Sequence, residues 1–188
     1  MNMPAPEDLR PFKLRIEDYE LLDGAGAFAM QRVELIEGVV VTVNSEFRPH
    51  NLLKNELTFR LRLALRTIGS ALDAYAEASL SLPPHNMPDV DVLVARSDAS
   101  GVHWTTAHAA IVIEVAASTL RTDLGFKKQL YAEHGIPEYW VADIEHRRVH
   151  QFWTPQDGAY RDTRLVPLAG PIASATLPDL IIDGAGIL

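Results

Sequence analysis

Four short segments place charged side chains in a fixed order among apolar residues. An acid lies in the strand-like stretch 33–36, an acid follows proline at 88–89, an acid interrupts the apolar run 113–115, and a lysine ends the segment 123–127. Carboxylate oxygens are the ligands that hard divalent cations prefer, and a lysine can steady a water or a phosphate. The order therefore favours a fold that brings two acids and a lysine to one place.

Length and composition favour one globular domain. The chain has 188 residues, of which 47% are apolar and 22% charged, and a chain of this length can bury a core without covalent cross-links. We therefore expect a single domain over residues 1–188, with the polar, proline-bearing segment 1–12 as a flexible N-terminal arm. The chain has no cysteine, which excludes disulfides and thiolate metal sites.

The segment 1–11 lacks a basic stretch followed by an apolar one, so it does not read as a signal peptide. No apolar run reaches the length of a membrane span, and we expect a cytoplasmic protein. The net charge of −8 argues against nucleic-acid binding over the whole surface, because such binding depends on neutralised phosphates. One stretch is rich in basic residues and has two interpretations, a local basic patch or a solvated helix face. It contains Arg48, Lys54, Arg60, Arg62 and Arg66.

The pattern of elements predicts a mixed α/β fold. Two β-rich runs flank Glu37-Gly38 and predict a hairpin over 31–44, because glycine supplies the positive φ of the turn. Leucine spacing predicts the longest helix over 49–68 and a further helix over 122–134. Further β-rich runs predict the strands 72–82 (one or two), 90–95, 110–116, 138–142, 147–153 and 160–167. We therefore expect a central mixed sheet flanked by helices.

The long predicted helix carries two apolar stripes. The first contains Leu53, Leu57 and Leu61, and the second contains Leu52, Phe59 and Leu63 on another part of the helical wheel. Large exposed apolar patches usually mark interfaces, and a two-fold dimer is the commonest symmetry. The second stripe therefore indicates either a homodimer or packing of both stripes inside one subunit.

Glu114 and the acids of the segment 89–91 are candidate metal ligands. Glu114 lies inside an apolar run, where an ionised carboxylate is costly to bury unless it is paired or binds a metal. The alternative is a glutamate at a sheet edge that pairs with an arginine. Asp89 and Asp91 lie on one face of the same strand, which gives a candidate ligand and a second acid. For Asp89 alone, a turn at the start of a strand is the simpler interpretation.

Three further residues have two interpretations each. Lys127 shares a helix face with Asp123 and Tyr131, and a solvent-exposed ion pair between Lys127 and Asp123 would explain the spacing without catalysis. Glu34 alternates with apolar residues, which also suits a solvent-facing strand position. His50 opens the long helix, a place where it need have no special role.

Taken together, these segments resemble the PD-(D/E)XK nuclease superfamily and, within it, the Uma2-type restriction endonuclease family. The resemblance covers about residues 14–183. The cues are Val33-Glu-Leu-Ile-Glu-Gly38, His50, Pro88-Asp89, Ile111-Val-Ile-Glu-Val115, Ser118-Thr119 followed by Asp123, Lys127 and Tyr131, and Gly135-Ile-Pro-Glu-Tyr-Trp-Val-Ala-Asp143. The last segment, at its distance from Lys127, is the most specific cue.

The resemblance implies a restriction-endonuclease-like fold and a set of roles. Asp89 and Glu114 would be the metal carboxylates, and the carbonyl of Val115 a further ligand. Lys127 would act from the helix, because the usual strand position holds Ala116, and Glu34 would be the accessory acid. The family commonly has a second acid after the hairpin glycine, where this chain has Val39.

The expected function is hydrolysis of DNA phosphodiester bonds by an endonuclease that depends on Mg²⁺, with Mn²⁺ as a possible substitute. DNA would be the substrate and a homodimer would suit cleavage of two strands. The competing interpretation is a non-catalytic binding or assembly module that retains the nuclease fold, because a fold does not fix a function. A metal titration with and without Asp89 and Glu114 discriminates between the two.

Overall fold

The computed structural model describes residues 10–43, 46–96, 98 and 100–188. The chain forms two compact units, one made of residues 1–44 and 81–88 and the other of residues 45–80 and 89–188. Most of the predicted arm 1–12 lies outside the described residues, and residues 10–12 have no regular secondary structure. One domain over the whole chain therefore stays a prediction.

The first unit contains the predicted hairpin. Helix α1 (Ile16–Gly24) precedes strands β1 (Val33–Ile36) and β2 (Val39–Thr42), which pair antiparallel. Glu37 and Gly38 connect the strands with φ values of 50° and 77°, as a two-residue turn of this hand requires. A Cβ at Gly38 would lie 2.6 Å from the Cβ of Lys13, so only glycine fits there. Ile16, Leu35 and Met87 form a small core.

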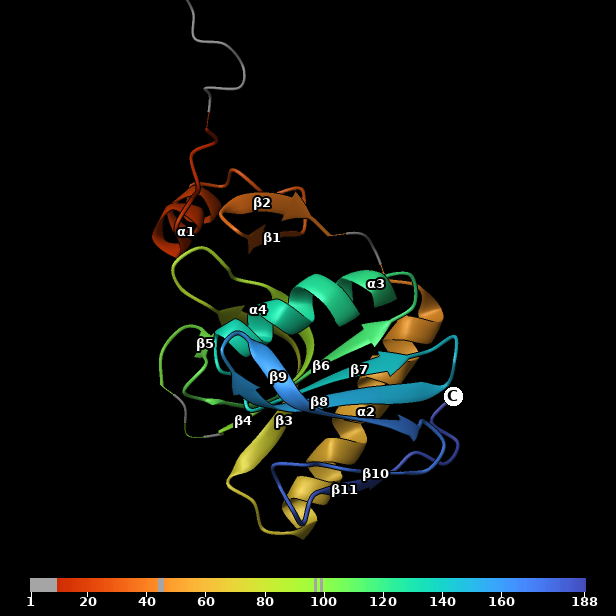
Figure 1. Ribbon diagram of the computed structural model, residues 1–188. Helices are drawn as coiled ribbons and strands as arrows, with labels where there is room; N and C mark the ends of the chain where they lie inside the picture. The colour runs from red at the N-terminus through yellow and green to blue at the C-terminus, as the bar shows by residue number, and fades with distance from the viewer. Residues whose placement is uncertain (1–9, 44–45, 97, 99) are drawn as a thin grey trace, which may run out of the picture. The chain divides into compact units, whose positions relative to one another are not determined.

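The second unit is built on a seven-stranded sheet with the order β5-β3-β4-β6-β7-β8-β9 (Figure 1). Strands β6 and β7 pair in parallel, whereas β4 with β6, β7 with β8 and β8 with β9 pair antiparallel. The mixed sheet that the sequence predicts is confirmed. The strands are β3 (Leu72–Ser81), β4 (Asp89–Arg96), β5 (Trp104–Thr105), β6 (Ala109–Ala116), β7 (Glu138–Asp143), β8 (Arg148–Gln156) and β9 (Ala159–Pro167).

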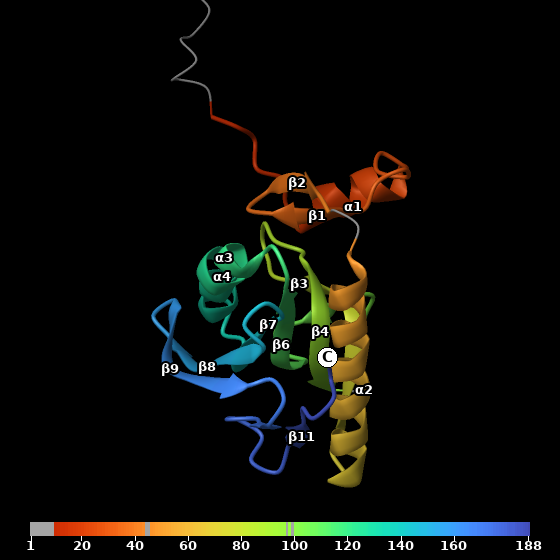
Figure 2. The ribbon, with the colours of Figure 1, turned by 90° about the vertical axis from the view of Figure 1, so that its right-hand side faces the viewer.

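Helices cover both faces of this sheet (Figure 2). Helix α2 (Arg48–Thr67) lies on one face, where its fully buried leucines join the core of Val92, Ile113 and Trp140. The crossover from β6 to β7 lies on the other face. Because β6 is covered on both sides, its residues are almost all apolar. A second, two-stranded sheet of β10 (Pro171–Ala173) and β11 (Ile181–Asp183) adds Ile172 and Ile182 to the core.

The crossover differs from the single helix predicted over 122–134. It consists of a short α-helical turn α3 (Leu120–Thr122), a π-helical turn η2 (Asp123–Lys127) and helix α4 (Lys128–Glu133). In the π-turn, the N–H of Lys128 donates to the carbonyl of Asp123. The hydroxyl of Tyr139 in β7 donates to the same carbonyl at 3.1 Å. This tertiary contact is the reason that local sequence did not predict the turn.

The second apolar stripe of α2 is exposed. Leu52, Phe59 and Leu63 have exposed fractions of 50%, 62% and 56%. The alternative in which both stripes pack inside one subunit is therefore wrong. No helix in the described part of the chain has the length and hydropathy needed to cross a membrane.

Leu57→Ala should destabilise the protein far more than Leu63→Ala. Leu57 is fully buried in the core, and the loss of a buried leucine side chain costs about 2–5 kcal/mol. Leu63 is mostly exposed, so its substitution should change the free energy of unfolding by less than about 0.5 kcal/mol. Urea unfolding of both variants measures this difference, and equal losses would contradict the described orientation of α2.

Candidate functional site

The candidate site lies where strands β4 and β6 stop pairing. Their antiparallel ladder reaches Val92 opposite Ile113, and the next residues on the two strands are Asp91 and Glu114. Here the side chain of Asp91 replaces a backbone acceptor, because its Oδ2 accepts a hydrogen bond of 2.7 Å from the N–H of Val115. The end of the ladder therefore brings two acids close to each other.

Glu114 is a deeply buried acid of the site, with an exposed fraction of 3%. The ammonium of Lys127 lies 2.9 Å from its Oε1, and the hydroxyl of Tyr131 donates to the same oxygen at 2.7 Å. Burial raises the pKa of Glu114 to about 8, and the charges of Asp91 and Asp123 act in the same direction against Lys127 and Tyr131. Both partners come from the crossover, so the helix and the acid fix each other's positions.

Asp123 is a second buried acid on the crossover. Its Oδ1 lies 3.9 Å from the Nζ of Lys127. Burial raises the pKa of Asp123, and Asp91 adds to this shift, whereas Lys127 and a hydrogen bond from Thr119 oppose it. Lys127 is therefore the cation that two buried carboxylates share.

Helix α2 contributes to the opposite side of Asp91. The Nε2 of His50 lies 3.2 Å from Asp91 Oδ2, and its Nδ1 lies 3.4 Å from Glu46 Oε2. Burial lowers the pKa of His50, but the two acids outweigh it and leave the pKa above its ordinary value. Burial likewise raises the pKa of Asp91, and His50, Val115 and Lys127 outweigh it and leave the pKa below its ordinary value.

Lys54 is a charged residue on the buried face of α2. Its ammonium contacts Glu46 and Glu77, each at 2.5 Å, while its side chain is almost fully buried. Glu77 lies in β3 with a φ of 53°, an unusual value for a residue with a side chain. Lys54 thus anchors two acids beside the site.

The donor set fits a divalent cation. Three acids, Asp91, Glu114 and Asp123, lie near enough that the charge of Asp91 raises the pKa values of the other two, and Lys127 and His50 are the basic residues beside them. One ligand atom each from Glu46, His50 and Asp91 also lies within 4.8 Å of the others. Carboxylates with one imidazole suit Mg²⁺ and, better, Mn²⁺. Buried acids in excess of their cations are costly, and a cation would offset that cost.

The residues predicted from sequence lie in different parts of the fold. Glu114 and Lys127 are in contact. Asp89 begins β4, where its Oδ1 accepts a hydrogen bond of 2.5 Å from the Ser79 hydroxyl, on the same strand face as Asp91 and about 6.6 Å along the strand from it. Glu34 is buried in β1 of the first unit, and Val115 contributes the N–H described above.

The sequence interpretation gave no role to several residues of this cluster. His50 and Tyr131 were cues without a function, Asp91 was a second acid, and Glu46 and Glu77 carried no hypothesis. Lys54 was expected in a basic patch or on a solvated helix face, and its exposed fraction of 1% shows that neither interpretation is right for this residue. One signal was present, because Lys54 lies seven residues before Leu61 and therefore shares its buried face of the helix. A lysine on a buried helix face indicates a buried ionic partner.

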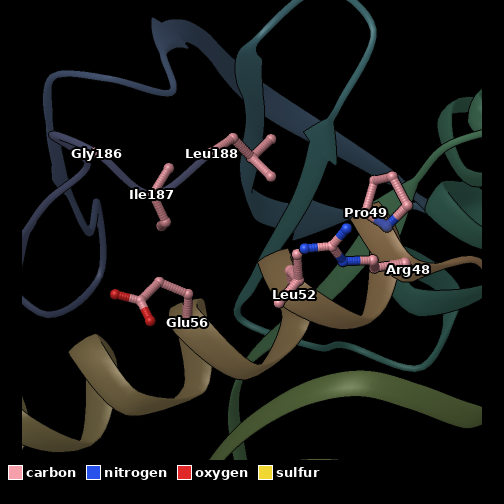
Figure 3. A pocket seen from close by; sticks show the side chains of 7 residues that line it. All are labelled: Arg48, Pro49, Leu52, Glu56, Gly186, Ile187 and Leu188. Carbon is pink, nitrogen blue, oxygen red and sulfur yellow. The ribbon is translucent and has the colours of Figure 1, made fainter.

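A separate hollow of about 440 Å³ lies beside the first turns of α2 (Figure 3). It is lined by Arg48, Pro49, Leu52, Glu56, Gly186, Ile187 and Leu188. None of these residues belongs to the acid cluster. The hollow adjoins the exposed stripe of α2 through Leu52.

The sheet and the crossover define a nuclease-type α/β fold. Comparison with known protein families and solved structures then identifies the family. The chain belongs to the Uma2 family, described as "Putative restriction endonuclease", whose profile matches residues 16–184. A crystal structure of "a putative nuclease belonging to DUF820" from Anabaena variabilis is similar to it, with a TM-score of 0.66 and 14% identity over 84% of this chain and 89% of that one. No curated protein matches the chain.

The stability of the cation-free protein should fall as the pH rises from about 4.5 to about 8. In this window the folded state keeps a proton on Glu114, whose pKa is raised from 4.5 to about 8, whereas the unfolded chain has released it. The folded state binds more protons, so a higher pH favours unfolding. Each unit of difference in pKa corresponds to about 1.4 kcal/mol.

Urea unfolding in a chelator at several pH values measures this dependence. Glu114→Gln has no proton to lose and should lack the decline. Parallel pH profiles for the wild type and Glu114→Gln would contradict the raised pKa.

Proposed function

We propose that the chain is a nuclease that hydrolyses DNA phosphodiester bonds with a bound Mg²⁺ or Mn²⁺. Membership of the Uma2 family supports the nuclease class. The observation that carries the proposal is the contact of 2.9 Å between Glu114 and Lys127, next to Asp91 at the end of a strand ladder. A buried acid beside a lysine combines a candidate cation ligand with a positive charge that could stabilise a phosphate.

The proposed cation ligands are Asp89, Glu114 and the carbonyl of Val115. Asp91 lies on the same face of β4 as Asp89, and it accepts the hydrogen bond from the N–H of Val115. Glu34 is the proposed accessory acid. Because Lys127 and Tyr131 both approach Oε1 of Glu114, Oε2 is the oxygen that we assign to the cation. The bound cation would polarise the phosphate and lower the pKa of an attacking water.

The chain's own side chains would orient the reaction. The Tyr131 hydroxyl restricts the rotation of the Glu114 carboxylate, because it donates to one of its two oxygens. Lys127 carries a positive charge at the same carboxylate and would offset the negative charge that develops on the phosphate. His50 holds Asp91 from the side of α2.

Lys127→Ala should abolish most cleavage, whereas Lys128→Ala should not. A lost charge donor at a transition state costs on the order of 10²-fold or more in rate. Lys128 is the neighbouring residue, but its ammonium lies 5.1 Å from the centre of the Phe152 ring, so it is a matched control. Cleavage of plasmid, linear and single-stranded DNA with Mg²⁺ and Mn²⁺ measures the difference.

Melting temperatures of both variants complete the experiment. Without Lys127, Glu114 can take up a proton because its pKa is raised, so the variant should still fold. Equal loss of activity in both lysine variants would exclude the proposed role of Lys127. Binding of Mn²⁺ by the wild type without cleavage of any DNA would favour a binding module over a nuclease.

A homodimer stays a prediction, and the exposed stripe of α2 is the surface that it would use. Phe59 lies at the centre of this stripe and is mostly exposed, so Phe59→Glu should convert a dimer into a monomer at micromolar concentration without unfolding it. Light scattering measures the mass. A monomeric wild type would remove the dimer from the proposal.

A further inference from the structure

Asp123 has a carboxylate oxygen without a hydrogen-bond partner. The residue is 1% exposed, and its Oδ2 is buried with no partner among the described residues. Its other oxygen lies 3.9 Å from the Nζ of Lys127, which is within the range of an ion pair but too long for a hydrogen bond. A buried acceptor that lacks a donor is costly, so its retention calls for a use.

Lys127 lies between two carboxylates with unequal contacts. Its ammonium is 2.9 Å from Glu114 and 3.9 Å from Asp123. The π-turn places both the lysine and Asp123 over β6, and buried Tyr139 holds that turn through the carbonyl of Asp123. Single π-turns within helices occur most often at functional sites.

The contact between Lys127 and Oε1 of Glu114 would weaken when the other oxygen of that carboxylate binds a divalent cation. The ammonium and the cation would carry like charges at one carboxylate, and their repulsion favours withdrawal of the lysine. The carboxylate of Asp123, 3.9 Å away, could then accept a hydrogen bond from the ammonium of Lys127. The ammonium would need to approach Oδ1 by only about 1 Å to form a charge-assisted hydrogen bond of about 2.8 Å.

We propose that Asp123 is a positioning residue, which takes over the ammonium of Lys127 when Glu114 binds a divalent cation. This inference rests on the proposed function and adds a residue to it. Asp123 keeps Lys127 charged and within the site, and it also removes the lysine as a competitor of the cation. Asp123 itself contacts neither the cation nor the phosphate.

The experiment measures the binding of Mn²⁺ by calorimetry, without DNA. It uses four full-length proteins: the wild type, Asp123→Asn, Lys127→Ala and the double variant. Asp123→Asn keeps the shape of the side chain and removes its charge. With Lys127 present, it should weaken Mn²⁺ binding about tenfold, a usual size for coupling between two sites, because the lysine stays on Glu114. In the Lys127→Ala background it should change the affinity less than about twofold.

A different result overturns the inference. If Asp123→Asn weakens Mn²⁺ binding equally in both backgrounds, Asp123 is a direct ligand and not a positioning residue. If it changes the affinity in neither, Asp123 has no part in cation binding. Should Asp123→Asn fail to melt cooperatively, Asp123→Ser carries the same comparison.

Asp143→Asn is the matched control. Asp143 is also 1% exposed, but it pairs with His146 and Arg148, so its substitution should leave Mn²⁺ affinity unchanged. Different results would contradict the proposed nuclease function and the proposed role of Asp123. A wild type that binds no Mn²⁺ removes the proposed function, whereas a wild type that binds Mn²⁺ and cleaves DNA, with Asp123→Asn unchanged, removes only the role of Asp123.

Discussion

The burial of Glu114 is the constraint on which the rest of the second unit depends. An acid in the central strand β6 lies between two helical layers, and its charge has to be balanced within them. Lys127 and Tyr131 do so from the crossover, at 2.9 Å and 2.7 Å from one oxygen. The crossover is therefore held against the sheet by a polar contact at its centre as well as by apolar packing. Removal of one member of such a buried pair usually destabilises more than the pair stabilises.

The opposite layer repeats the arrangement with other residues. Helix α2 is mainly an apolar helix on its buried face, yet His50 and Lys54 interrupt that face and meet Asp91, Glu46 and Glu77. Acids and bases thus alternate from one layer to the other across the end of the β4–β6 ladder. This alternation lets several charges be buried together, although the acids outnumber the bases: Lys54 is shared by Glu46 and Glu77, and Lys127 by Glu114 and Asp123.

The sequence predicted the elements that local patterns decide. The Glu37-Gly38 turn, the long helix and the strand around Glu114 follow from periodicity and from backbone preferences, which need no tertiary information. The π-turn at Asp123 escaped prediction because a tyrosine from β7 holds it. Spacing along the helix pointed to an ion pair of Lys127 with Asp123, whereas the closer carboxylate is that of Glu114, the acid that the order of segments had placed near this lysine. The sequence showed Asp91 as an acid beside Asp89, but it did not predict that the pairing of β4 with β6 ends at this residue.

The place of the lysine on a helix has a physical consequence. A lysine at the position of Ala116 would extend from the same strand as Glu114, and its direction would be fixed by the pleat of the sheet. Lys127 instead approaches from above the strand, with a flexible side chain and an acid one helical turn away. The proposed exchange of one carboxylate for another therefore needs only rotation of the lysine side chain. The chain combines an acid in a buried strand with a base on the layer that covers it, and this division suits the proposed site, in which a cation would bind the acid and the lysine would keep its positive charge.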